Sequence, residues 1–114
     1  MKAKYFLAAV ICCLSVSAFS QTKTDTVKVW GNCEECKNKI ETAAKKAGAI
    51  DASWSDETYQ LVINYDAAAT SSLNIEKEIA AVGYDTQDIK ATDAAYKKLP
   101  KCCQYTRGDG TKQD

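Results

Sequence analysis

The order of its strand-like and helix-like segments constrains the fold of this chain most strongly. Apolar and polar residues alternate in three segments, which predicts β-strands at residues 25–30, 50–55 and 59–65. In the second strand, Ile50, Ala52 and Trp54 are expected to share one face. Two other segments repeat apolar residues every three or four positions, which predicts helices at residues 34–47 and 73–82. The inward-facing residues are Ile40, Ala43, Ala44 and Ala47 in the first helix and Ile75, Ile79 and Val82 in the second.

A weaker fourth strand at residues 84–91 would complete the order strand–helix–strand–strand–helix–strand. That order is the ferredoxin-like arrangement of the α+β class, with both helices on one face of a single sheet. The loop between the first strand and the first helix then lies at an exposed end of the sheet. A short helix capped by Asp93 is expected at residues 93–99, and the polar chain from Arg107 onward is expected to be disordered.

The first twenty residues have the three-part pattern of a secretory signal peptide. Two lysines precede an apolar stretch at residues 5–14, which is shorter than the roughly 20 apolar residues that a membrane span needs. Small residues follow, and we expect cleavage after Ser20, with an uncleaved N-terminal anchor as the alternative. Cleavage would place the mature chain in the periplasm or outside the cell. It would then comprise a domain at residues 21–91 and an extension at residues 92–114.

Composition excludes several classes of function. The 15 basic and 15 acidic residues give a formal net charge of zero, so the chain lacks the basic excess that is typical of nucleic-acid-binding domains. It contains no histidine, which excludes imidazole metal ligands, histidine general bases and Cys–His nucleophile pairs. The length suits one small domain, and we expect a monomer or a dimer bridged by a metal ion.

Four of the cysteines would remain after cleavage, in the pairs Cys33–Cys36 and Cys102–Cys103. Cys33 and Cys36 lie where the first strand gives way to the first helix, and their spacing can place two thiols on one metal ion or join them in a disulfide. Thiolates are soft ligands, and two of them suit Cu(I) better than Zn(II), which prefers four ligands. The helix N-terminus favours thiolate formation, whereas the charges of the two intervening glutamates oppose it.

Four short motifs follow one another along residues 26–88. They are Gly31-Asn32-Cys33-Glu34-Glu35-Cys36, Ile40-Glu41, Tyr65-Asp66 and Gly83-Tyr84-Asp85. Together they resemble the heavy-metal-associated domain family of copper-chaperone-like and periplasmic mercury-binding proteins. The resemblance implies that Cys33 and Cys36 bind a soft ion, most often Cu(I), with Zn(II) and Hg(II) as alternatives, and that Tyr84 packs beside the site. The loop is one residue shorter than usual, and Trp30 is expected to fill the space of a methionine that the family has there.

The second pair, Cys102 and Cys103, is not part of the common module and has several interpretations. It can supply further ligands to the same ion, form a separate thiol site, or form disulfides with the first loop. Alternatively, it packs under the end of the chain, where its neighbours Tyr96, Leu99 and Tyr105 are expected to be packing residues rather than ligands.

Three functions are compatible with these patterns. The preferred one is a non-enzymatic module that sequesters a soft ion or passes it to a metal-transporting membrane protein. The second is a thiol–disulfide oxidoreductase that uses Cys33 and Cys36. Against it, thioredoxin-like folds place a cis-proline beside the active cysteines, whereas the only proline, Pro100, lies outside the predicted domain. The third is a small interaction domain stabilised by disulfides.

Overall fold

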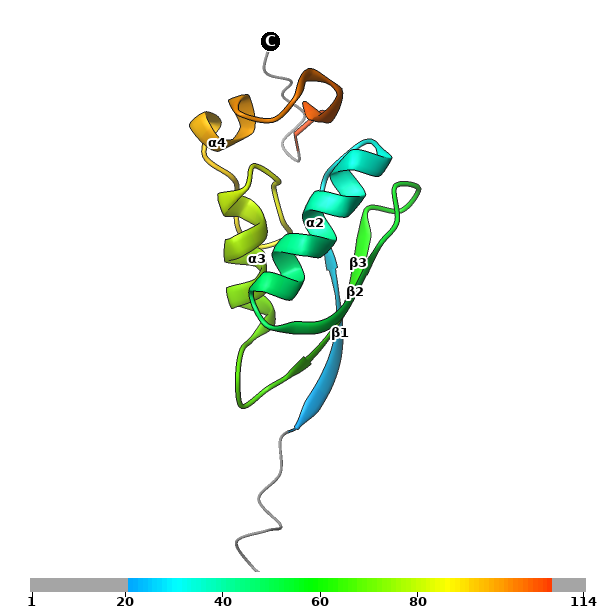
Figure 1. The fold of residues 1–114 in the computed structure, drawn as a ribbon, viewed down its shortest axis with the longest axis vertical. Helices are drawn as coiled ribbons and strands as arrows, with labels where there is room; N and C mark the ends of the chain where they lie inside the picture. Colours follow the sequence, from blue (N-terminus) through cyan, green and yellow to red (C-terminus); the bar gives the residue numbers. More distant parts are fainter. Residues whose placement is uncertain (1–20, 108–114) are drawn as a thin grey trace, which may run out of the picture.

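The computed structural model describes residues 21–107, and its ribbon is shown in Figure 1. The predicted signal peptide at residues 1–20 and the polar end at residues 108–114 lie outside the described residues. The elements are β1 (Thr22–Lys28), α2 (Glu34–Lys46), β2 (Ala49–Trp54), β3 (Gln60–Asp66), α3 (Ser72–Ala81), α4 (Asp93–Lys97) and the 3₁₀ turn η1 (Lys101–Cys103). Within residues 21–107, no helix has both the length and the apolar character that a membrane crossing requires.

The three strands form one antiparallel sheet in the order β1-β3-β2. Leu61, near the start of the central strand β3, pairs with Val27 on one side and with Trp54 on the other, and all three side chains are buried. Helices α2 and α3 lie side by side on the same face of the sheet and enclose the core (Figure 1). The predicted ferredoxin-like α+β class is therefore confirmed.

The prediction of a fourth strand at residues 84–91 is wrong, because this segment does not form a full strand. Residues 84–91 contribute only an isolated bridge between Thr86 and Val29, supported by hydrogen bonds from Trp30 N to the Asp85 carbonyl (3.0 Å) and from Gln87 N to the Lys28 carbonyl (2.7 Å). The chain then turns away, because Thr86 N donates to the carbonyl of Ile89 (2.7 Å). The pairing nevertheless holds this segment beside the end of β1.

Three predicted details differ at the ends of elements. Ile50 does not share the buried face of β2 and is 60% exposed, because a register shift between Ala49 and Asp51 turns Ala49 inward instead. Val82 is also exposed, since α3 ends at Ala81 and Val82 is its C-cap residue. The N-cap of α4 is Thr92, whose side chain accepts a hydrogen bond from Ala95 N, rather than Asp93. End effects of this kind depend on caps and bulges more than on periodicity.

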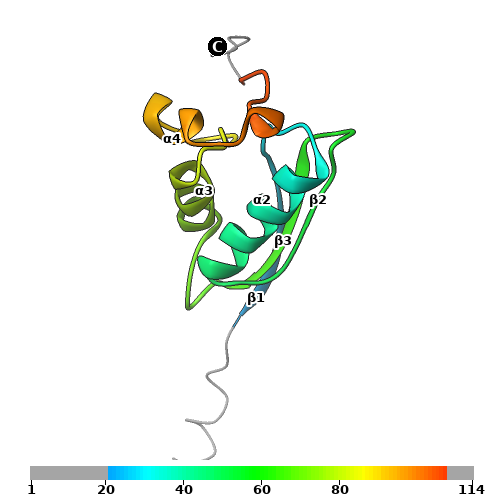
Figure 2. The same ribbon diagram turned by 45° about the horizontal axis from the view of Figure 1, so that its top comes forward.

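The C-terminal extension folds back across the end of the domain. In Figure 2, α4 and η1 lie beyond the ends of α3 and α2, on the side of the first strand–helix loop. The Tyr105 hydroxyl donates to the Gly83 carbonyl (2.8 Å) and accepts from Asp85 N (2.6 Å), and its ring stacks on Tyr84 at 5.6 Å between centroids. The Tyr96 hydroxyl in turn donates to the Tyr105 carbonyl (2.6 Å). As predicted, Tyr96 and Tyr105 are packing residues.

Arg107 fixes the end of the extension to the domain. The prediction that disorder begins at this residue is therefore wrong. Its side chain is 4% exposed, and its guanidinium donates to both carboxylate oxygens of Asp85, at 2.9 and 2.6 Å. It also donates to Asp93 (2.8 Å) and to the carbonyl of Ala91, and it lies 5.1 Å from the centroid of the Tyr96 ring. Bidentate Arg–carboxylate pairs are among the strongest polar contacts in proteins, so this one anchors the extension to the domain.

Candidate metal centre

The loop before α2 positions the first two thiols. Cys33 is the N-cap residue of α2 with an extended backbone, and Cys36 lies in the first helical turn, where it is fully buried. Gly31 allows the loop to lie close to the core, because a Cβ there would meet the Trp54 ring at 3.1 Å and the Cys36 Cβ at 3.3 Å. The Trp54 indole N–H donates to the carbonyl of Val29 (2.9 Å), which fixes the strand end that leads into the loop.

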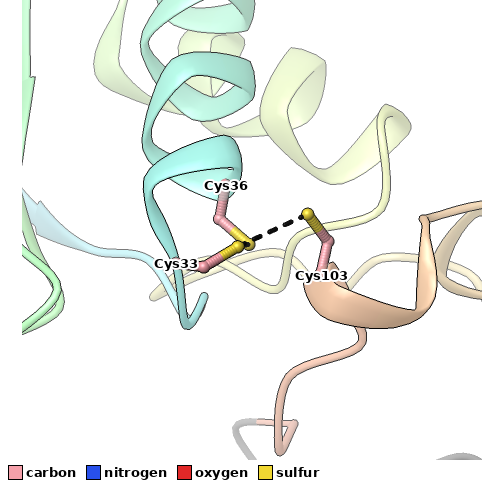
Figure 3. Close-up of side chains that lie close together, drawn as sticks. All are labelled: Cys33, Cys36 and Cys103. Atoms are coloured by element: carbon pink, nitrogen blue, oxygen red, sulfur yellow. Dashed lines mark hydrogen bonds between the residues drawn. The ribbon is translucent and has the colours of Figure 1, made fainter.

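The third thiol comes from the extension. Figure 3 shows Cys103 of η1 facing Cys33 and Cys36 across the start of α2. The Cys33 sulfur lies 3.4 Å from that of Cys36 and 3.7 Å from that of Cys103. Cys36 and Cys103 are fully buried and Cys33 is half-buried, and the three sulfurs lie within 4.8 Å of one another. Residues about 70 positions apart in the sequence thus form one compact cluster.

These separations suit sulfurs that share one metal ion. With metal–sulfur bonds of about 2.3 Å, ligand sulfurs lie about 3.8 Å apart in a tetrahedral site and about 4.0 Å apart in a trigonal one. Tyr84 gives a second reason to place a metal ion among these sulfurs. Its hydroxyl is buried and makes no ordinary hydrogen bond. Burial, together with the thiols of Cys36 and Cys103, raises the pKa of Tyr84, so the hydroxyl stays a donor. Ionised thiolates would offer this donor an acceptor, and metal binding requires thiolates.

Cys102 occupies the rim of the cluster. It is exposed, its thiol donates to a carboxylate oxygen of Glu35 (3.1 Å), and its sulfur lies 3.9 Å from that of Cys103. The same Glu35 oxygen lies 3.9 Å from the Cys103 sulfur, so these three residues form a second group of candidate ligands. The backbone carbonyl of Cys102 is 3.5 Å from the Cys33 sulfur.

The thiols differ in how readily they ionise. Burial opposes ionisation of Cys33, but the backbone N–H groups of Cys36 and Glu35 and the thiols of Cys36 and Cys103 outweigh it, so the pKa of Cys33 is lowered. Burial and the neighbouring thiols of Cys36 and Cys33 raise the pKa of Cys103. The hydrogen bond to Glu35 raises the pKa of Cys102. Cys33 is therefore more readily ionised than Cys102 or Cys103 in the metal-free site.

We expect iodoacetamide at neutral pH to modify Cys33 of the reduced protein before Cys102, although Cys102 is the more exposed. The reason is that the thiolate is the reacting species and the lowered pKa of Cys33 increases its thiolate fraction. Peptide mass spectrometry after timed quenching would measure the order. Cys36 and Cys103 are the internal controls and should react last, because both are fully buried. Faster modification of Cys102 than of Cys33 would contradict the expectation.

Three residues near the cluster were not among the predicted site residues. Asn32 accepts a hydrogen bond from the Cys36 thiol through its side-chain oxygen (3.1 Å), and Glu35 contacts Cys102. The indole that packs against the loop at Gly31 belongs to Trp54, which the sequence suggested only as a core residue. The Trp30 ring lies 5.2 Å from the ammonium group of Lys28, and its predicted role beside the metal stays a prediction.

Comparisons with known proteins fit this fold and cluster. No family model matches the chain. A zinc-transporting ATPase of Synechocystis sp. is 35% identical over 75 residues, which cover 64% of this chain and 10% of the relative, so this chain spans about a tenth of that protein. Oxidized MerP from Ralstonia metallidurans CH34 is 32% identical, with 58% of this chain and 94% of MerP covered and a TM-score of 0.55. The CopZ metallochaperone is 26% identical, with 56% and 98% covered and a TM-score of 0.53.

Fold and thiol cluster together define a small α+β module that is similar to metallochaperones and other metal-binding domains. The chain belongs to the heavy-metal-associated domain family. The matches cover nearly the whole of CopZ and MerP, but they leave about two fifths of this chain uncovered.

Proposed function

We propose that this protein binds one soft metal ion, Cu(I) in the first place, and sequesters it or passes it on without catalysing a reaction. The observation that carries the proposal is the convergence of Cys33, Cys36 and Cys103 at one point beside the buried hydroxyl of Tyr84. Thiolates are soft ligands and select soft metal ions. Because the chain has no histidine, cysteine sulfur is its principal ligand for such an ion.

Coordination number and charge bear on the choice of ion in opposite ways. Three sulfurs meet in the buried cluster, whereas Zn(II) prefers four ligands, so coordination number favours Cu(I). Three thiolates around Cu(I) leave two negative charges in a largely buried site, whereas a divalent ion leaves one. The N-terminus of α2 and the Tyr84 hydroxyl offset part of that excess charge. We therefore rank Cu(I) first and treat Hg(II) and Zn(II) as the ions to compare with it.

The protein is further proposed to act in the periplasm or outside the cell, after cleavage near Ser20. The support is the signal-peptide pattern of the first twenty residues. Its proposed partner is a metal-transporting membrane protein, and the support is the similarity to a domain-sized part of a zinc-transporting ATPase. We propose a monomer, because the thiols that one ion needs come from a single chain.

A thiol–disulfide oxidoreductase is the second candidate. It is favoured by the 3.4 Å separation of the Cys33 and Cys36 sulfurs and by the lowered pKa of Cys33. We rank it lower because a third, fully buried thiol, that of Cys103, lies only 3.7 Å from the Cys33 sulfur, which suits ligation of an ion better than exchange with a substrate disulfide.

Native mass spectrometry of the reduced protein tests the proposal. With Cu(I), Zn(II) and Hg(II) supplied separately and then in competition, we expect one ion per chain and Cu(I) to be preferred. The matched control is the same protein after alkylation of its thiols, which should retain none. Failure of the reduced protein to retain any ion would overturn the proposal. Rapid insulin reduction that is lost in Cys33→Ser would favour the oxidoreductase.

A further inference from the structure

Cys103 belongs to two groups of candidate ligands at once. The inner group is Cys33, Cys36 and Cys103, and the outer group is Glu35, Cys102 and Cys103. In each group the ligand atoms lie within 4.8 Å of one another. The sulfur of Cys103 would therefore be a ligand in either position, whether the outer group or the inner group holds the ion.

The two groups differ in their access to solvent. Cys102 and Glu35 are exposed, whereas Cys36 and Cys103 are fully buried. A donor or acceptor that carries its own thiols can thus contact an ion at Cys102 more easily than an ion held by the inner group. The thiol of Cys102 already lies 3.1 Å from the Glu35 carboxylate, whose negative charge would attract a metal cation to this point.

The turn η1 explains how neighbouring cysteines serve both groups. Pro100 is its N-cap residue, and Cys103 N donates to the Pro100 carbonyl (2.8 Å). This tight turn directs Cys103 into the core and leaves Cys102 at the surface. Tyr105 and Arg107 then fix the following chain to the domain. The two sulfurs lie 3.9 Å apart, so an ion could pass between the groups without backbone rearrangement.

We propose that Cys102 and Glu35 form a port through which the metal ion enters and leaves the inner site. This inference rests on the proposed function, metal binding. The ion is first bound by Cys102 and Cys103 beside Glu35. The Cys33 and Cys36 sulfurs then bind it, and the bond to Cys102 breaks, while the bond to Cys103 is kept throughout. Each cysteine that binds the ion releases its thiol proton to water, and Cys102 takes one back when the ion moves inward. The oxidation state of the metal does not change.

A different path into the site is available on the other side of Cys33. A depression there is lined by Cys33, Glu34 and Lys37 together with the end of β2 and the turn that follows it. Glu34 and Glu35 are adjacent, exposed and equal in charge, but only Glu35 contacts Cys102. Substitutions at these two positions therefore form a matched pair that distinguishes the two paths.

The test separates the rate of ion exchange from the equilibrium affinity. The Cu(I)-loaded protein is mixed with excess sulfonated bathocuproine in a stopped-flow instrument, and affinity is measured by competition with the same chelator. We expect Cys102→Ser to slow removal of Cu(I) about tenfold, which corresponds to a barrier about 1.4 kcal/mol higher. The affinity should fall far less than in Cys103→Ser, because Cys102 is not bonded to an ion that the inner group holds. Glu35→Gln should slow removal by a smaller factor, and Glu34→Gln should leave the rate unchanged.

Each contrary result has a distinct meaning. An unchanged rate in Cys102→Ser would overturn the port. A loss of affinity in Cys102→Ser as large as that in Cys103→Ser would also overturn it, because Cys102 would then be a resident ligand. A greater slowing by Glu34→Gln than by Glu35→Gln would assign exchange to the other side of Cys33. If the unsubstituted protein retains no ion, the proposed function itself fails, and that result is distinguishable from the other three.

Discussion

We expect Cys103→Ser to lower the affinity for Cu(I) by more than about 100-fold, because changes to residues that only support metal ligands already cost 10–100-fold. Cys103 is fully buried, and its sulfur lies 3.7 Å from that of Cys33. Serine keeps the size of the side chain but replaces a soft thiolate by a hard, protonated hydroxyl. The measurement is a competition titration with a chromogenic Cu(I) chelator.

Cys33→Ser and Cys36→Ser provide the comparison, since the loop cysteines should show losses of similar size. Urea unfolding of the metal-free proteins separates a lost ligand from a damaged core, because it measures the stability that Cys103→Ser loses by burying a hydroxyl. A stable Cys103→Ser variant with unchanged affinity would reduce the site to the two loop thiols. That result would leave the extension without a role in ion binding.

The contrast between the two cysteine pairs shows what the sequence can specify. The placement of Cys33 and Cys36 is local, since an extended N-cap residue and the first turn of α2 define it. The position of Cys103 depends on contacts that no local pattern encodes, such as the stacking of Tyr105 on Tyr84. The sequence therefore left several interpretations of the second pair open, and the tertiary contacts of the extension bring Cys103 to the loop.

The fold was predictable to a similar extent. Periodicity located the first three strands and the first two helices, because these elements bury one continuous face. It misplaced Ile50, whose exposure follows from a register shift in β2, and it overestimated the fourth strand. In that segment, Asp85 is held by Arg107, a residue that polarity alone placed in a disordered tail. A buried ion pair between distant residues cannot be recognised from either residue alone.

We expect Arg107→Met to lower the free energy of unfolding by about 3–5 kcal/mol, because it leaves the carboxylate of Asp85 buried without its cationic partner. Asp85 is 1% exposed, so solvent screening gives little relief. A loss of this size is a large fraction of the roughly 5–15 kcal/mol by which small domains are stable. Urea unfolding followed by far-ultraviolet circular dichroism measures it. Affinity for Cu(I) should fall in the same variant, since the anchor of the segment that carries Cys103 is lost.

Asp93→Asn is the matched control. It removes a carboxylate that also binds Arg107, but the Asp93 side chain is 70% exposed, so we expect a cost below about 1 kcal/mol. Combining Asp85→Asn with Arg107→Met should recover part of the lost stability, because the buried charge is then removed together with its partner. If Arg107→Met and Asp93→Asn are equally mild, the extension is held mainly by its tyrosines. In that case Tyr105→Phe, which removes the bonds to Gly83 and Asp85, should cause the larger loss of both stability and affinity.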